Sequence, residues 1–126
     1  MQEDRIVDIP DNRIKFFGTT GKMLLPCSKT VATIISKIPE GKLMTTEQLR
    51  KTLSEQFQVQ GTCPVTLKKS LQAVVKESNH LPYWRIIKAN GETLSYIPDA
   101  KEKLEKEGFE IEAKDKKIKE ALLKGF

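Results

Sequence analysis

The chain of 126 residues has few of the groups from which metal sites, disulfide frameworks and histidine-based triads are built. Its single histidine, His80, excludes triads and metal centres that use several histidines. Two cysteines, Cys27 and Cys63, are too few and too far apart for a zinc site or a disulfide framework. We therefore expect structural thiols in a reduced cell compartment, and neither a metal nor a cofactor.

Long apolar runs are also absent from the sequence. No stretch approaches the roughly 18 apolar residues of a membrane span. The first residues lack the basic and then apolar layout of a secretory signal. We expect an intracellular, cytoplasmic protein, nucleoid-associated if it binds DNA, without a membrane partner.

Charge is distributed unevenly along the chain, which has 22 Lys+Arg, 17 Asp+Glu and a net charge of +5. Residues 99–126 hold eight acids and eight lysines, a neutral mixture typical of a solvated helix. From Cys63 to Lys88, five basic residues accompany a single acid, Glu77. Such a basic patch suits a polyanion, although a merely solvated helix face has the same composition.

Apolar spacing predicts three consecutive helices in the middle of the chain. The first begins near Ser28, the second at Thr45, which forms a capping-box pattern with Gln48, and the third at Pro64. Each carries apolar residues at the three- and four-residue spacing of one buried face. The predicted core positions are Val31, Ile34, Ile35, Ile38, Leu49, Leu53, Leu67, Leu71, Val74 and Val75.

The segments on either side of these helices predict two hairpins. Residues 5–9 and 13–17 alternate between polar and apolar side chains, as two short strands would, and a turn follows them. Residues 84–88 and 93–97 flank Asn90-Gly91, a strong hairpin signal. This second hairpin is the expected wing of a helix-turn-helix.

The order of elements predicts an α+β, mainly helical fold: a winged helix-turn-helix DNA-binding domain with a short β wing and extra terminal elements. Residues 1–24 are expected to form an N-terminal β arm or hairpin, and residues 25–111 the winged domain. That domain closes with a charged helix over residues 99–107. Residues 112–126 are expected to add a charged C-terminal helix.

Three fragments in this order resemble the alkylguanine-DNA alkyltransferases and their alkyltransferase-like relatives. Residues 38–49 (IPEGKLMTTEQL) look like the start of the family's helix-turn-helix. Residues 81–87 (LPYWRII), followed by Asn90-Gly91, look like its Pro-Cys-His-Arg active-site motif with the loop beyond. Residues 104–108 (LEKEG) match its closing helix, so that the resemblance covers about residues 31–111.

In that family the motif cysteine accepts the alkyl group, activated through the adjacent histidine and a glutamate of the closing helix. The matching residues here are Tyr83, Trp84 and Glu107. Neither a phenol with a pKa of about 10 nor an indole replaces a thiolate nucleophile at neutral pH, so we expect no enzyme activity. The resemblance then implies a non-catalytic protein that flips alkylated guanine out of double-stranded DNA and signals the lesion to nucleotide-excision repair proteins. We expect it to act as a monomer.

The resemblance also assigns residues to a base pocket and to a DNA-binding helix. Val65 stands where the family inserts an arginine into the base stack, and Thr46 stands where it has a pocket tyrosine. Lys68 and Lys69 replace two small residues and add phosphate affinity. The expected pocket residues are Tyr83, Trp84, Arg85, Thr45, Thr46, Asn90, Gly91 and Ser95. The expected DNA-binding residues are Val65, Thr66, Lys68, Lys69, Gln72 and Lys76.

Three other functions are compatible with the same residues. A winged-helix transcription regulator would read the major groove with Gln72 and Lys69. An alkyltransferase could use a displaced cysteine, Cys63 or Cys27. A protein-interaction module could keep the fold without DNA affinity, because fold alone does not determine function.

Overall fold

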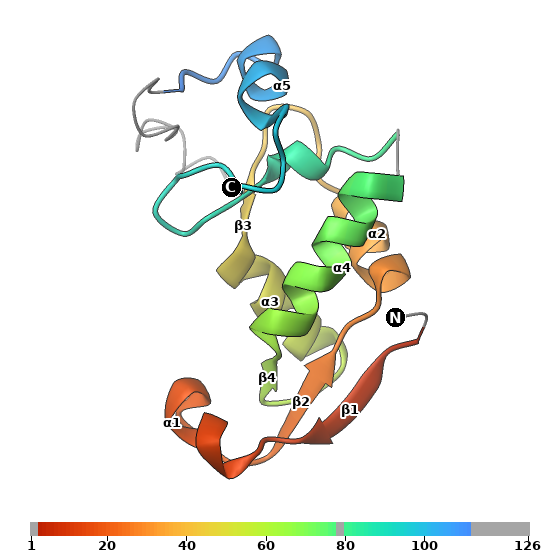
Figure 1. Ribbon diagram of the computed structural model, residues 1–126, viewed down its shortest axis with the longest axis vertical. Helices are drawn as coiled ribbons and strands as arrows, with labels where there is room; N and C mark the ends of the chain where they lie inside the picture. Colours follow the sequence, from red (N-terminus) through yellow and green to blue (C-terminus); the bar gives the residue numbers. More distant parts are fainter. Residues whose placement is uncertain (1–2, 78–79, 112–126) are drawn as a thin grey trace.

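The computed structural model describes residues 3–77 and 80–111, which form an α+β protein with five α-helices and two small sheets (Figure 1). The α+β class predicted from the sequence is confirmed. None of the helices in these residues has the length and apolar character that crossing a bilayer requires. In chain order the elements are β1 (Arg5–Asp8), the 3-10 turn η1 (Asp11–Arg13), α1 (Ile14–Phe17), β2 (Lys22–Leu25), α2 (Ser28–Ile35), β3 (Met44–Thr45), α3 (Thr46–Gln56), β4 (Gly61–Thr62), α4 (Pro64–Glu77), the 3-10 turn η2 (Tyr83–Arg85), β5 (Ile86–Ile87) and α5 (Ala100–Lys106).

The three predicted central helices are α2, α3 and α4, and they lie between the β1-β2-β4 sheet at one end of the molecule and α5 at the other (Figure 1). The predicted capping box starts α3: the Gln48 amide N–H donates to Thr45 Oγ1 at 3.0 Å, and the Thr45 amide N–H donates to Gln48 Oε1 at 2.8 Å. All predicted core positions are buried in one cluster except Val75, which packs against it partly buried. Burial of this shared apolar face is the main favourable contribution to the fold.

The predicted N-terminal hairpin is wrong in its second strand. Strand β1 pairs antiparallel with β2 instead, and β2 pairs parallel with β4, which ties the N-terminal segment to the start of α4. Residues 13–17 are helical, in η1 and α1. Ile14 and Phe17, three residues apart, both pack against the cluster of Ile9, Met23 and Cys63, and this spacing suits one helical turn.

The predicted wing is much smaller than the sequence indicates. Strand β5 pairs parallel with β3 rather than with residues 93–97, and the predicted strand pairing across the turn is reduced to an isolated antiparallel bridge between Ile87 and Thr93. The Asn90-Gly91 turn does form, with the Lys88 amide donating to the Glu92 carbonyl at 2.8 Å. Beyond it, Leu94 and Ile97 are both buried. Residues three apart in a strand point to opposite faces of a sheet, so this segment does not follow the predicted strand pattern.

Helix α5 confirms the predicted closing helix. It packs Leu104 against Leu43, Ile87 and Phe109 in a second apolar cluster. Asp99 precedes the helix but makes no side-chain cap to it. The predicted last helix, over residues 113–124, lies outside the described residues.

Candidate nucleic-acid interface

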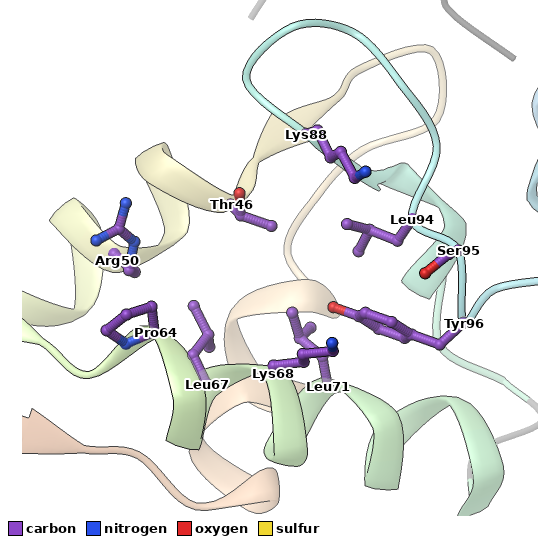
Figure 2. A pocket seen from close by; sticks show the side chains of 10 residues that line it. All are labelled: Thr46, Arg50, Pro64, Leu67, Lys68, Leu71, Lys88, Leu94, Ser95 and Tyr96. Atoms are coloured by element: carbon purple, nitrogen blue, oxygen red, sulfur yellow. The ribbon is translucent and has the colours of Figure 1, made fainter. Parts of the chain in front are cut away.

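The first turns of α3, the α4 helix and the loop after β5 line a cavity of about 310 Å³ that is partly open to solvent (Figure 2). In Figure 2, α4 forms the floor, α3 and the loop face each other across the cavity, and Lys88 extends over it. The lining residues are Thr46, Arg50, Pro64, Leu67, Lys68, Leu71, Lys88, Leu94, Ser95 and Tyr96. The volume is at the lower end of the range for small-molecule pockets, about 300 to 1,000 Å³, so the cavity suits one small group.

The lining combines apolar walls, three hydroxyl groups and three cations. The cations are Arg50, Lys68 and Lys88, and no acidic residue in the described part of the chain lines the cavity. Tyr96 extends its ring from the loop toward the middle of the space (Figure 2). An aromatic ring stacks on a flat base, and the cations around it attract a phosphate. The cavity therefore suits a nucleotide, which carries both groups.

Two of these cations have aromatic rather than acidic neighbours. Lys68 Nζ lies 6.0 Å from the centroid of the Tyr96 ring, and Arg50 Cζ lies 5.5 Å from the centroid of Phe16. Within residues 3–77 and 80–111, neither cation is in a salt bridge. Lys88 pairs with Glu92 at 3.5 Å, an exposed pair of the kind that contributes little and is easily exchanged. The positive charge at the cavity is therefore available to a ligand.

Helix α4 exposes the face that the sequence assigned to DNA. Val65 is 49% exposed, and Lys69, Gln72 and Lys76 are exposed along the same stripe. Lys68 stands at the border between this stripe and the cavity, since it is exposed and also lines the cavity. The remaining residue of the predicted set, Thr66, is half-buried. The stripe and the cavity are therefore neighbouring parts of one surface.

The motif residues Trp84 and Arg85 lie elsewhere, around the carboxylate of Glu107. Trp84 Nε1–H donates to Glu107, Arg85 Nε–H donates to both carboxylate oxygens at 3.0 and 3.1 Å, and the Gly41 amide donates at 3.2 Å. Burial alone would raise the pKa of Glu107, but these hydrogen bonds and the charge of Arg85 lower it. Arg85 also donates to the carbonyl of Ile38 at 2.6 Å. This cluster holds the chain before α3 against α5.

Tyr83 is part of the same structural region. Its hydroxyl donates to Asp99 Oδ2 at 2.9 Å, and its ring meets Trp84 edge to face, with centroids 5.3 Å apart. Burial, the hydrogen bond to Asp99 and the charge of Asp99 all raise the pKa of Tyr83. Neither Tyr83 nor Trp84 lines the cavity. Of the predicted pocket residues, the structure brings only Thr46 and Ser95 into it.

The other predicted pocket residues shape the backbone. Thr45 caps α3, as described above. Asn90 Nδ2 donates to Glu92 Oε1 at 2.8 Å, and Asn90 Oδ1 accepts from the Glu92 amide at 3.0 Å. Gly91 has a φ of 92°, a conformation that favours glycine. Thr45, Asn90 and Gly91 thus position the two sides of the cavity without lining it.

Three lining residues with clear chemical value were not predicted: Arg50, Lys88 and Tyr96. Arg50 follows Thr46 by four residues on the predicted helix, so the i, i+4 spacing could have placed both on one face. Tyr96 follows the predicted pocket residue Ser95. The sequence predicted a strand here, and because neighbouring side chains of a strand point to opposite faces, it did not place Tyr96 in the pocket with Ser95. Burial raises the pKa of Tyr96 to about 12, so its hydroxyl remains a hydrogen-bond donor at neutral pH.

Both cysteines are buried thiols, and neither lines the cavity. For Cys63, burial raises the pKa, but hydrogen bonds from Thr66 and the Val65 backbone and the charge of Arg13 outweigh it, and the pKa is lowered. Arg13 Nη1 lies 3.9 Å from the Cys63 sulfur. Among the described residues, no group of three or more histidine, cysteine or acidic side chains could hold a metal ion.

No protein-family model matches the chain, and neither a curated protein nor a solved structure is significantly similar to it. The resemblance to the alkyltransferases therefore stays a prediction from three sequence fragments.

Proposed function

We propose that the protein is a non-catalytic DNA-binding protein that accepts one flipped base, an alkylated guanine, in the cavity beside α4. Binding there would mark the lesion for nucleotide-excision repair proteins. The observation that carries the proposal is a small, partly apolar cavity lined by three cations and an inward-pointing tyrosine, next to an exposed basic helix face. Cations attract the phosphates of DNA, and an aromatic ring stacks on a base.

The arrangement of helices supports a winged helix-turn-helix with a reduced wing. Helix α3 would cross the DNA backbone, and α4 would enter a groove as the recognition helix, with its exposed lysines near the phosphates. Val65, exposed beside the cavity residue Pro64, is suited to act as an apolar wedge in the base stack. A wedge next to a cavity is what base flipping requires.

Inside the cavity, each kind of side chain has a separate task. Tyr96 supplies a stacking face, and the hydroxyls of Thr46 and Ser95 are hydrogen-bond partners for the edge of the base. Lys68 and Arg50 would contact the phosphates on either side of the flipped nucleotide.

The residues at the motif support a non-catalytic role. Tyr83 is hydrogen-bonded to Asp99 and has a raised pKa, so it remains a neutral phenol at neutral pH. Glu107 is occupied by Trp84, Arg85 and Gly41. The thiols of Cys27 and Cys63 are buried and do not line the cavity. No thiolate therefore stands where a flipped base would lie.

The test is a titration of matched DNA duplexes that contain either guanine or guanine methylated at its oxygen, at two salt concentrations. We expect tighter binding to the methylated duplex and weaker binding to both at higher salt. Lys68→Ala should weaken binding, whereas Lys106→Ala, which removes an exposed lysine of α5, should not. Equal affinity for both duplexes with strong preference for one sequence would favour a transcription regulator that reads bases with Gln72 and Lys69. Absence of DNA binding would overturn the proposal.

A further inference from the structure

Phe16, on α1, is the most exposed large apolar side chain among the described residues, at 57%. The proposed function does not use it, and the sequence predicted a strand at this point. A single exposed apolar side chain carries no meaning by itself. The surroundings of Phe16 decide whether its exposure matters.

The ring of Phe16 is held in a defined position by its neighbour. Phe17 packs against it edge to face, with ring centroids 5.0 Å apart, and Phe17 itself lies over Gly61 of β4. A Cβ at position 61 would come within 2.4 Å of Phe17 Cδ1, so this close approach requires glycine. Because Phe17 is anchored in this way, Phe16 is presented outward at little further cost in conformational entropy.

Arg50 joins Phe16 to the cavity. Its guanidinium lies 5.5 Å from the centroid of the Phe16 ring, and the same side chain lines the cavity. On the Phe16 side, Arg50 also lines an open groove of about 650 Å³ between α1 and α3. The cavity and the groove therefore meet at one arginine.

The charge of the groove differs from that of the cavity. Glu47 and Glu55 balance Arg50 and Lys51 in its lining, so the groove has no net attraction for phosphate. What it offers a nucleic acid is an exposed aromatic ring with a guanidinium over one of its faces. That combination stacks on bases and has little dependence on their sequence.

We propose that Phe16 and Arg50 form a second stacking site, for an unpaired base next to the one in the cavity. This inference rests on the proposed function and deepens it: the preferred ligand is DNA in which the nucleotide beside the lesion is also unpaired. A fully paired neighbour would keep its base in the duplex stack and leave Phe16 without a partner.

The experiment compares two labelled duplexes that contain the same methylated guanine, one fully paired and one with the next nucleotide in an unpaired bulge. The wild-type protein should bind the bulged duplex more tightly. Phe16→Ala should weaken that binding by at least about fivefold and change binding to the paired duplex by less than about twofold. Phe16→Trp should retain the preference. Because stacking involves no phosphate, the salt dependence of binding should be the same for Phe16→Ala and the wild type.

The matched control is Ile6→Ala, which truncates another exposed apolar side chain, on β1, that lines neither the cavity nor the groove. Thermal unfolding should give the same midpoint for both alanine variants. If Phe16→Ala binds the bulged duplex as tightly as the wild type, this inference is overturned while the proposed function stands, and Phe16 is then a candidate contact for a protein partner. If the wild type binds neither duplex, both are overturned.

Discussion

Two clusters in this protein combine basic and aromatic side chains, and they differ in whether a carboxylate neutralises the cations. Around the cavity, Lys68 and Arg50 contact the rings of Tyr96 and Phe16 and are in no salt bridge within the described residues. Around Glu107, Arg85 and Trp84 both donate to one buried carboxylate. A cation already bound to a carboxylate stabilises the fold, whereas a cation without an acidic partner remains available to an anionic ligand.

The motif residues lie outside the cavity, in contrast to what the resemblance implies. The sequence resemblance directs attention to Tyr83 and Trp84, yet both lie in the cluster around Asp99 and Glu107. Ser95, from the loop, does reach the cavity, together with its neighbour Tyr96. We therefore assign stability to the Glu107 cluster and ligand binding to the cavity, and each of the following changes should affect only one of the two.

The largest expected effect is on stability. Glu107→Ala removes the acceptor of a pair whose side chains are only 13% and 8% exposed, and it leaves Arg85 buried without its partner. The free energy of unfolding, measured by urea denaturation, should fall by about 3 to 5 kcal/mol. The control Glu102→Ala breaks the exposed pair with Lys106 and should change it by less than about 1 kcal/mol. Similar values for both variants would mean that the buried cluster is not structural.

The next effect is on recognition of the lesion. Tyr96→Ala should weaken binding to a methylated duplex by about 1 to 3 kcal/mol, and by less for an unmodified duplex, because it removes the stacking face in the cavity. Tyr83→Phe, which loses only the hydrogen bond to Asp99, should bind both duplexes like the wild type. Fluorescence anisotropy measures both variants. A selective loss for Tyr83→Phe would restore the pocket role that the resemblance implies.

Substitutions on the exposed face of α4 should weaken binding to all DNA duplexes equally. Lys69→Glu combined with Lys76→Glu should weaken binding to any duplex by at least about tenfold, because both lysines are exposed on one face and would contact phosphates. The double variant Lys37→Glu with Lys106→Glu changes the net charge by the same amount at exposed lysines outside α4, and it should bind more tightly than the first. Equal losses would attribute binding to net charge alone.

A smaller effect concerns pH. The pKa of Glu107 is lowered in the folded protein, so the unfolded chain takes up the proton more readily and stability rises with pH. The contribution is fully present above the ordinary glutamate pKa of 4.5 and is lost as the pH falls through the lower pKa of the folded state. The free energy of unfolding, measured by urea denaturation, should fall more steeply for the wild type than for Glu107→Gln as the pH is lowered from about 7 to about 3. Parallel curves would contradict the assigned ion pair.

No change at all is expected in covalent mass. After incubation with a methylated duplex, the intact protein should carry no added methyl group, because the motif residue is Tyr83 and both cysteines are buried. Intact mass spectrometry makes the measurement, with the unfolded protein as a check that its thiols are present. A stoichiometric methyl group on Cys63 or Cys27 would restore the alternative of an alkyltransferase with a displaced cysteine.

Local patterns in the sequence determined the elements whose stability depends on near neighbours. The capping box of Thr45 and Gln48 and the three-to-four spacing of Val31, Ile34 and Ile35 need only the chain within one or two helical turns. The same holds for the exposed stripe of α4, since a helix with one buried face must expose the other. The basic face at Lys69 and Lys76 could therefore be predicted from the sequence.

Only the tertiary structure decided the features that depend on distant partners. Residues 14–17 became a helix because Ile14 and Phe17 both pack on Ile9, Met23 and Cys63, a cluster drawn from three other segments. The strand at Ile86 pairs with β3, more than 40 residues earlier in the chain, so the local hairpin signal was overruled. The cavity likewise needs α3, α4 and the loop at Tyr96 together. The pairing of Arg85 with Glu107 also depends on the tertiary structure, and it separates this buried cation from those that line the cavity. Such contacts join residues far apart in sequence, and periodicity within one segment contains no information about them.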